Sequence, residues 1–309
     1  MKDNVLAVDI GGSKLICGVL TKDSEIIDTY RVDYPKEYTL ETIIGFIRLG
    51  YERLKKYPCS CCGIAIPGLS DPESGDWLYS PFSGIENVPI TKIVNQITGL
   101  PAYGDNDVNV SALAERYFGV CRNTDDFLWI TVSNGIGGGL FLNGKLYRGK
   151  SLNAGEIGHF IVEENNPRKC GCGNSGCLEA MASGASIANI YNEITGNKLA
   201  GPQIAELARK GDKIAYEVWA NAGAYIGKAV SYAVNLLGID CVVLGGGAAE
   251  AFDLLKPSID ASIKKYAFSS ANPNVKILHS SLGKYAALTG CVALTKYNSD
   301  NKEGAFENE

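Results

Sequence analysis

One histidine and three cysteines lie close together in the middle of this 309-residue chain, in a spacing that suits a zinc ion. They are His159, Cys170, Cys172 and Cys177. Structural zinc takes four nitrogen or sulfur ligands in a tetrahedron, and three thiolates with one imidazole are a common set. Because four protein ligands leave no position for water, we expect a structural Zn²⁺ rather than a catalytic one. The alternative is a group of free thiols or disulfides, although a Cys-x-Cys pair is difficult to bridge internally.

Two carboxylates, Glu156 and Glu179, flank this metal-binding segment. Sugar hydroxyls are hydrogen-bond donors, and an ionised carboxylate is an acceptor for one or two of them. If one ring nitrogen of His159 binds zinc, the other carries a proton and could donate to a further hydroxyl. The pattern therefore suggests a place where a sugar is held. The alternative is that both glutamates are ordinary surface charges.

Composition excludes several other classes of protein. Hydrophobic residues make up 46% of the chain and charged residues 20%, which is typical of a globular protein with about two domains. The net charge of −5 gives no basic face for nucleic acid. The most apolar helix pattern, at 219–237, contains Lys228, Ser231 and Asn235, so we expect no membrane span. Ten cysteines without an N-terminal export signal predict reduced thiols and a cytoplasmic protein.

Cys59, Cys61 and Cys62 form a second group of cysteines, in or beside the apolar run CCGIAIPG. They could form another metal site. We interpret them as small hydrophobic residues of a strand, since unpaired cysteine packs well in a core.

The hydrophobic pattern predicts the same arrangement in two halves of the chain. Strand patterns at 4–10, 14–20 and 25–32 are separated by short turns, so these strands should be antiparallel. A strand, a glycine turn and a strand recur at 126–144. This repetition predicts two duplicated α/β domains with a cleft between them. We expect a small domain at 1–115, to which the helix at about 284–297 also belongs. A large domain follows at 116–283, and a disordered tail at 298–309.

At this point the motifs resemble those of the ROK group of sugar kinases, within the actin-like ATPase (ribonuclease H-like) fold. The similarity covers nearly the whole chain, and the order of the motifs makes it specific. They are VDIGGSK, IAIPG, GDNDVNVSALAE, VSNGIGGG, GEIGH with CGCGNSGCLE, and VVLGGG. Some members of this group are repressors with a helix-turn-helix before the first motif. Here Met1 lies only a few residues before VDIGGSK, which favours an enzyme.

The resemblance implies that two glycine turns hold the phosphates of ATP through backbone N–H groups, and that VVLGGG contacts adenosine. Each turn alone could be an ordinary tight turn. Asp9 is implied to help hold hydrated Mg²⁺, and Lys14 faces either phosphate or solvent. Many relatives have threonine where this chain has Asn134. The implied nucleotide-binding residues are Asp9, Gly11, Gly12, Ser13, Lys14, Ser133, Asn134, Gly135, Gly137, Gly245, Gly246 and Gly247.

For the catalytic base, the resemblance selects Asp107 rather than Asp105. A sugar hydroxyl must lose its proton as it attacks the γ-phosphorus, and kinases generally use an aspartate to accept it. The alternative role for Asp107 is an N-cap of the helix that follows. The implied sugar-binding residues are Gly68, Asn106, Asp107, Glu156, His159 and Glu179.

The sequence therefore predicts an ATP-dependent kinase of carbohydrate metabolism that phosphorylates a hexose or amino sugar at its 6-hydroxyl. Glucose-specific relatives often have asparagine where this chain has Phe82, so the sequence does not identify the sugar substrate. One alternative is a sugar-sensing ROK protein that has lost catalysis, and another is an actin-like ATPase without a sugar substrate. The resemblance also implies a homodimer.

Overall fold

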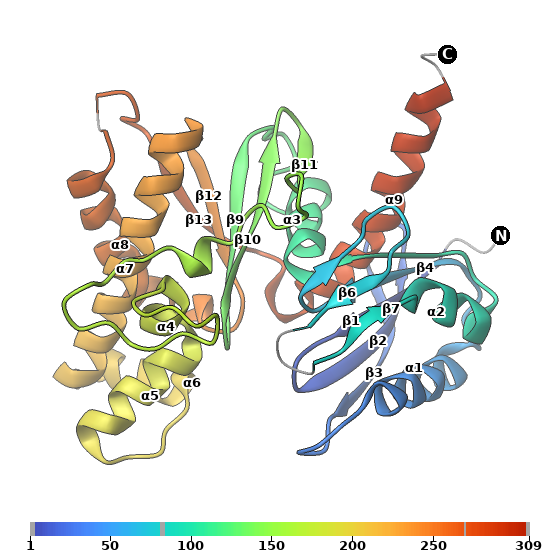
Figure 1. Cartoon of the computed structure of the whole chain (residues 1–309), viewed down its shortest axis with the longest axis horizontal. Helices are drawn as coiled ribbons and strands as arrows, with labels where there is room; N and C mark the ends of the chain where they lie inside the picture. The colour runs from blue at the N-terminus through green and yellow to red at the C-terminus, as the bar shows by residue number, and fades with distance from the viewer. Residues whose placement is uncertain (1–3, 81–83, 269, 307–309) are drawn as a thin grey trace. The chain divides into compact units, whose positions relative to one another are not determined.

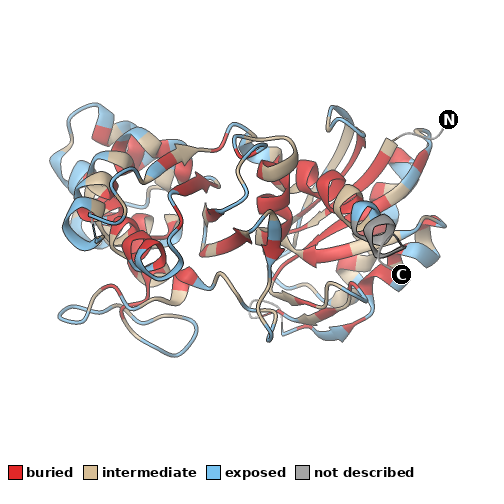
Figure 2. Ribbon diagram, turned by 90° about the horizontal axis from the view of Figure 1, so that it is seen from above, coloured by how far each residue is buried: buried red, intermediate tan, exposed pale blue. Residues whose placement is uncertain are grey.

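The computed structural model describes residues 4–80, 84–268 and 270–306, and the chain divides into two compact units. Unit 1 comprises Met1–Asn123, Gly149–Asn153 and Lys284–Glu309. Unit 2 comprises Thr124–Arg148 and Ala154–Gly283. Each unit is built on its own five-stranded sheet with helices (Figure 1), and the central strands of both sheets are buried (Figure 2).

The sheet of unit 1 has the strand order β3-β2-β1-β4-β8. The first three strands are antiparallel, as their short turns predicted, whereas β4 and β8 run parallel to β1. A parallel neighbour needs a crossover, and helices supply the crossovers here. The strands are β1 (Asn4–Ile10), β2 (Lys14–Thr21), β3 (Ile26–Asp33), β4 (Cys59–Ile66) and β8 (Ala102–Asn106).

Helices cover both faces of this sheet. A side chain at Gly50 in α1 (Leu40–Leu54) would meet Cys17 of β2, whereas one at Gly18 would meet Leu288 of α9 (Ala286–Phe306). Successive residues of a strand point to opposite faces, so α1 and α9 lie on opposite sides of β2. Helix α9 also packs against α3 (Asp107–Tyr117), and α2 (Ile90–Thr98) packs against β8.

The stretch between β4 and α2 contains short strands. It forms a small antiparallel sheet of β5 (Leu69–Ser70), β6 (Trp77–Tyr79) and β7 (Glu86–Val88). These strands are too short to show a periodic pattern, and the 1% exposed Trp77 anchors them in the core of unit 1. Phe82, the residue that differs from the glucose-specific relatives, lies outside the described residues.

The sheet of unit 2 repeats the arrangement of unit 1, with the order β11-β10-β9-β12-β13. Here too the first two pairings are antiparallel and the last two are parallel. The equivalent of the β1–β2 turn is the turn between β9 and β10, as the repeated glycine pattern predicted. The strands are β9 (Phe127–Val132), β10 (Ile136–Leu142), β11 (Lys145–Tyr147), β12 (Cys241–Gly245) and β13 (Lys276–His279).

A group of helices packs around the long helix α7 (Lys213–Leu237), which Asp212 caps by accepting from the Ala215 backbone N–H at 2.8 Å. A Cβ at Gly223 or Gly227 would collide with the backbone of α8, so these glycines allow the two helices to approach closely. The other helices of the unit are α4 (Leu178–Ala182), α5 (Gly184–Thr195), α6 (Gly201–Arg209) and α8 (Phe252–Tyr266). Short 3₁₀ helices in the described part of the chain are η1 (Ile157–His159) and η2 (Ala249–Ala251) in unit 2, and η3 (Gly283–Tyr285), where the chain returns to unit 1.

Helix α9 extends further than the sequence indicated. Disorder was predicted from residue 298, but the helix continues to Phe306. The polar residues at this end are held locally: Asn298 Nδ2 donates to the Leu294 carbonyl at 2.9 Å, and Tyr117 Oη donates to Asp300 Oδ2 at 3.0 Å. Composition therefore overstated the disorder of this segment. Within the described residues, no helix is long and apolar enough to cross a membrane.

Candidate functional site

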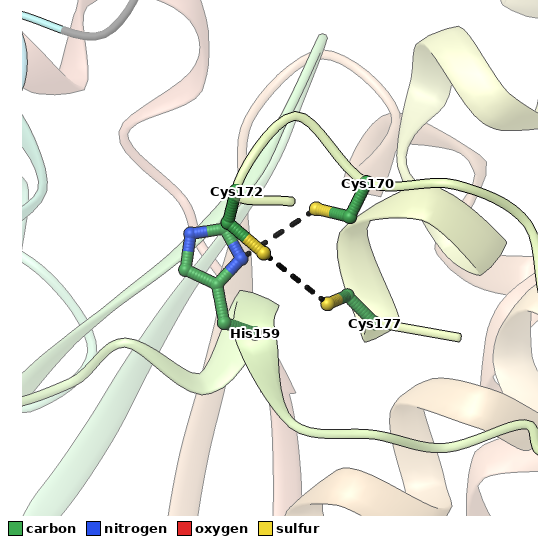
Figure 3. Close-up of side chains that lie close together, drawn as sticks. All are labelled: His159, Cys170, Cys172 and Cys177. Atoms are coloured by element: carbon green, nitrogen blue, oxygen red, sulfur yellow. Dashed lines mark hydrogen bonds between the residues drawn. The ribbon is translucent and has the colours of Figure 1, made fainter. Parts of the chain in front are cut away.

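The four predicted zinc ligands come together in unit 2, where their nitrogen and sulfur atoms all lie within 4.8 Å of one another. His159 Nδ1 is 3.7 Å from Cys170 Sγ, and Cys172 Sγ is 3.6 Å from Cys177 Sγ (Figure 3). Zinc bonds of about 2.0–2.3 Å in a tetrahedron put neighbouring ligand atoms about 3.6–3.8 Å apart. These two distances match that spacing, and the four side chains could therefore hold a metal ion.

Tight turns of the chain produce this arrangement. The backbone N–H of Cys170 donates to the Asn174 carbonyl at 2.9 Å, and that of Gly173 donates to the Cys170 carbonyl at 3.1 Å. Gly173 has φ of 96° and Gly176 has φ of 79°, a region that other residues rarely adopt. At Gly176 a Cβ would also collide with the Glu163 carbonyl. Glycines thus bend the loop so that its cysteines face the histidine.

The predicted hydroxyl-binding groups Glu156 and His159 are neighbours. With Nδ1 of His159 directed at the sulfurs, its Nε2 lies 3.8 Å from Glu156 Oε2. Burial raises the pKa of Glu156, the imidazole of His159 opposes this shift, and the negative charge of Glu179 adds to it. The second carboxylate, Glu179, accepts the backbone N–H of Ile136 at 3.0 Å through Oε2. The three residues therefore form one polar group beside the predicted metal ligands.

Asp107 is the first residue of α3, and Asn106 is the N-cap. Asn106 Oδ1 accepts the backbone N–H groups of Val108 at 2.9 Å and Asn109 at 3.1 Å. Asp107 Oδ1 accepts from Asn106 Nδ2 at 3.2 Å and from the Val108 N–H at 3.0 Å. The structure thus gives the capping role to Asn106, and the Asp107 carboxylate lies half-buried at the positive end of the helix dipole.

Asp105 has a different environment and is only 1% exposed. Its Oδ1 accepts the Asn106 backbone N–H at 2.7 Å, and it lies 3.3 Å from both Ser70 Oγ and Asn109 Nδ2. These contacts give Asp105 a role in shaping the turn between β8 and α3.

Gly68 joins the same group of residues. Its carbonyl accepts Asn106 Nδ2 at 2.7 Å, and its φ of 88° favours glycine. The structure therefore brings Gly68, Asn106 and Asp107 together in unit 1, whereas Glu156, His159 and Glu179 are together in unit 2.

The first predicted phosphate loop is the turn between β1 and β2. The backbone N–H of Gly11 donates to the Lys14 carbonyl at 2.9 Å. Two contacts that the sequence did not indicate fix the turn: Tyr38 Oη donates to the Gly12 carbonyl at 2.9 Å, and the Tyr34 N–H donates to the Ser13 carbonyl at 2.8 Å. Tyrosines after a strand carry no recognisable motif, so only the fold identifies them.

Asp9 lies at the end of β1, just before this turn. Burial raises the pKa of Asp9 to about 6, although the positive charge of Lys14 opposes the shift. An ionised carboxylate in such a place is stabilised by a nearby cation. The chemistry of Asp9 therefore suits a residue that helps to hold a hydrated divalent ion.

The second predicted phosphate loop, between β9 and β10, borders a cavity of about 420 Å³ that lies within unit 2. The Ser133 N–H donates to the Gly135 carbonyl at 2.9 Å, which closes the turn. The cavity is lined by this turn, by the segment after β12, and by helices α5, α6 and α7. Lining residues include Ser133, Asn134, Ala185, Ala205, Trp219 and Gly247.

The three glycines of VVLGGG occupy different positions. Gly247 lines the cavity. In contrast, a Cβ at Gly245 would collide with the ring of Trp129, and Gly246 has φ of 91° and lies against the Val132 carbonyl. Gly245 and Gly246 thus allow β12 to pack on β9 and turn sharply, and Gly247 is the one of the three at the cavity.

Trp219 and Arg209 also line the cavity, although no motif pointed to them. Trp219 is 1% exposed, and among the described residues its indole Nε1 has no hydrogen-bond partner. The indole nitrogen is itself buried, so Trp219 contributes apolar ring surface to the cavity rather than an accessible donor. Arg209 is held in place by two hydrogen bonds to Asp253, at 2.9 and 2.6 Å.

Comparison with known proteins gives a consistent result. A family model described as ROK family matches residues 5–298. The glucokinase of Thermotoga maritima is 30% identical over 311 residues, covering 96% of this chain and 98% of that protein. The DNA-binding transcriptional dual regulator NagC of Escherichia coli is 32% identical over 275 residues, covering 86% of this chain and 67% of that protein.

Among solved structures, the ROK family glucokinase from Streptomyces griseus, in complex with glucose and AMPPNP, is similar with a TM-score of 0.85. It is 28% identical, and the alignment covers 94% of this chain and 98% of that one. The predicted fold class is confirmed: this is the mixed α/β fold of actin-like ATPases. With a match from residue 5 to residue 298, the chain belongs to the ROK family.

Proposed function

We propose that this protein is an ATP-dependent sugar kinase that phosphorylates a hexose or amino sugar, with the 6-hydroxyl as the acceptor. The observation that carries the proposal is the position of Asp107, a half-buried carboxylate at the start of α3 beside Asn106. The similarity to glucokinases along nearly the whole chain supports it.

In the proposed reaction, Asp107 accepts the proton of the sugar hydroxyl as that oxygen attacks the γ-phosphorus of ATP. The bond between the γ-phosphorus and the bridging oxygen breaks, and ADP leaves. The Val108 N–H, the Asn106 amide and the helix dipole all favour the ionised form of Asp107 before the proton is transferred. Asp107 would also orient the attacking oxygen.

The sugar would be recognised by groups that suit hydroxyls. Glu156 and Glu179 would accept hydrogen bonds, and His159 Nε2 would donate one because Nδ1 is directed at the cysteines. A structural Zn²⁺ bound by His159, Cys170, Cys172 and Cys177 would fix the ring of the histidine. Asn106 and the backbone at Gly68 would contribute further contacts.

ATP would be held through its phosphates by the turns at 11–13 and 133–137, with Lys14 near the first turn. The adenosine would enter the cavity lined by Trp219 and Gly247. Asp9 would help to hold Mg²⁺, which neutralises phosphate charge in reactions of this class. Asn134 replaces the threonine of many relatives, and its amide could still donate to phosphate.

The test is a coupled ADP-release assay over a panel of hexoses, N-acyl amino sugars and glycosides, each with Mg²⁺ and ATP. We expect sugar-dependent turnover with at least one of them, and analysis of the product would identify the phosphorylated oxygen. A panel without any sugar-dependent ADP release would contradict the kinase.

A second candidate is a sugar-binding regulator without catalysis, which the 32% identity to NagC favours. It predicts that calorimetry detects sugar binding while no phosphorylated product forms. The two functions are therefore separated by measuring both quantities on one preparation. As part of the same proposal we expect a homodimer, and sedimentation would give its mass.

A further inference from the structure

Glu179 contacts the second phosphate loop directly. Its Oε2 accepts the backbone N–H of Ile136, the first residue of β10, at 3.0 Å. The same oxygen lies so close to Gly135 that a Cβ there would collide with it. A carboxylate 43 residues away in sequence is therefore part of the wall of this turn.

The opposite side of the turn is also anchored to the segment that carries Glu179. The Ser133 carbonyl accepts the Gly184 N–H at 2.7 Å, and Gly184 begins α5 directly after α4. The hydroxyl of Ser186 donates to the Glu179 carbonyl at 2.9 Å, which ties α5 to α4. Two hydrogen bonds, one at each end of the turn, therefore join it to α4 and α5.

The same segment is continuous with the metal ligands. Helix α4 begins immediately after Cys177, whose carbonyl accepts the Met181 N–H at 3.1 Å. The second oxygen of Glu179, Oε1, lies 3.9 Å from Cys170 Sγ. The carboxylate is thus held between the metal ligands and the phosphate loop.

We propose that Glu179 is a positioning residue for the nucleotide as well as a sugar contact. By holding the Ile136 N–H, it fixes the shape of the 133–137 turn whether or not a sugar is bound. This inference depends on the proposed function, because it assumes that the turn binds phosphate. A sugar contact alone has no reason to change nucleotide affinity in the absence of sugar.

Two substitutions at Glu179 distinguish the effect of side-chain length from the effect of charge. Glu179→Gln keeps the side-chain length and an acceptor oxygen for the Ile136 N–H. Glu179→Asp keeps the charge but is shorter by one carbon–carbon bond, about 1.5 Å, so it cannot span the distance. We therefore expect the glutamine variant to keep the turn in place and the aspartate variant to release it.

The measurement is the affinity for AMPPNP with Mg²⁺, by calorimetry without sugar. We expect Glu179→Asp to weaken binding about 10-fold, in line with the loss of a hydrogen bond to a charged group, and Glu179→Gln to stay within about threefold of the unchanged protein. Glu217→Gln is the control, because Glu217 is an exposed residue of α7 that does not line the cavity. It should leave AMPPNP affinity unchanged.

Metal content and thermal midpoint of each variant are measured alongside, because a loosened metal loop would also move them. If Glu179→Asp binds AMPPNP as tightly as the unchanged protein and loses only sugar affinity, the positioning role is overturned. The proposed kinase function would not be affected by that result. An equal loss of AMPPNP affinity in both Glu179 variants would also overturn the positioning role, since the length of the side chain would then not be the cause. If the unchanged protein fails to bind AMPPNP, the proposed function itself is wrong.

Discussion

Asp105 and Asp107 are two residues apart, yet of the two only Asp105 is fully buried, where it accepts from the Asn106 N–H and from Ser70 Oγ of β5. Asp107 lies one position beyond the N-cap Asn106, which satisfies the first N–H groups of α3 and so leaves the capping role to the asparagine. The two carboxylates therefore differ in what a substitution would reveal.

Replacing Asp107 by asparagine should reduce turnover by about a thousandfold or more, because an amide cannot accept the proton of the attacking hydroxyl. Sugar binding should change little, since the amide preserves the shape of the side chain. Turnover is measured by ADP release and sugar affinity by calorimetry. Activity near that of the unchanged protein would remove Asp107 as the base.

Asp105→Asn is the informative comparison. Its carboxylate accepts one backbone N–H at 2.7 Å, so the amide should destabilise the fold by about 1–3 kcal/mol. Chemical unfolding measures this free energy. A large stability loss in Asp107→Asn with none in Asp105→Asn would reverse the assignment of the two roles.

Cys172→Ser should lose the metal, because hydroxyl is a poor replacement for a thiolate in a zinc tetrahedron. We expect bound zinc to fall from about one ion per chain to nearly none, together with a lower thermal midpoint. Elemental analysis measures the first quantity and calorimetry the second. The control is Cys61→Ser, a half-buried cysteine outside the cluster, which should keep its zinc. Unchanged zinc in Cys172→Ser would refute the site.

Ala185→Phe should obstruct the cavity in unit 2. Ala185 is an exposed residue of α5 that lines the cavity, so a larger side chain would extend into solvent-accessible space rather than into the core. We expect the KM for ATP to rise about tenfold while the KM for the sugar changes little. Asn189→Phe, one helical turn further along α5, is the control and should leave both values unchanged. An unaltered KM for ATP in Ala185→Phe would place the adenosine elsewhere.

The buried carboxylate of Asp9 should lower the stability of the fold as the pH rises. Burial raises the pKa of Asp9 from 3.8 to about 6, so between these values the folded state binds more protons than the unfolded state. Its contribution to stability therefore falls as the pH rises from about 4 to about 6. Without Mg²⁺ and nucleotide, Asp9→Asn should stabilise the protein little at pH 4 and by at most about 3 kcal/mol at pH 8. Urea unfolding at pH 4 and at pH 8 measures the change in the free energy of unfolding. An equal change at the two pH values would contradict the raised pKa of Asp9.

The residues that were predictable from the sequence are those whose partners are close along the chain or follow a strand pattern. The four predicted metal ligands span only 159–177, and the structure brings their ligand atoms within 4.8 Å of one another. The antiparallel strands at 4–33 followed from alternation and short turns. The choice of Asp107 over Asp105 as the base rests on the family resemblance and stays a prediction. The structure adds that Asp105 is buried and Asp107 half-buried, a difference that the local sequence does not show.

Long-range contacts were not predictable in this way. Tyr38 lies 26 residues from the carbonyl that it contacts, and Glu179 lies 43 residues from Ile136. Trp219 lines the cavity from a long helix whose pattern indicates only a buried face. Such contacts depend on how helices and strands pack, and hydrophobic periodicity does not encode which polar atoms then meet.

The repeated strand order separates the two sheets from the segments that carry the predicted sugar-binding residues. Each sheet carries its glycine turn between its first two strands, whereas the predicted metal ligands, Glu156 and Glu179 lie in the long segment between β11 and β12. The shorter excursion of unit 1, between β4 and β8, contains Gly68 and Phe82. In the proposed kinase, changes within these two segments would therefore alter the acceptor molecule while both sheets stay the same.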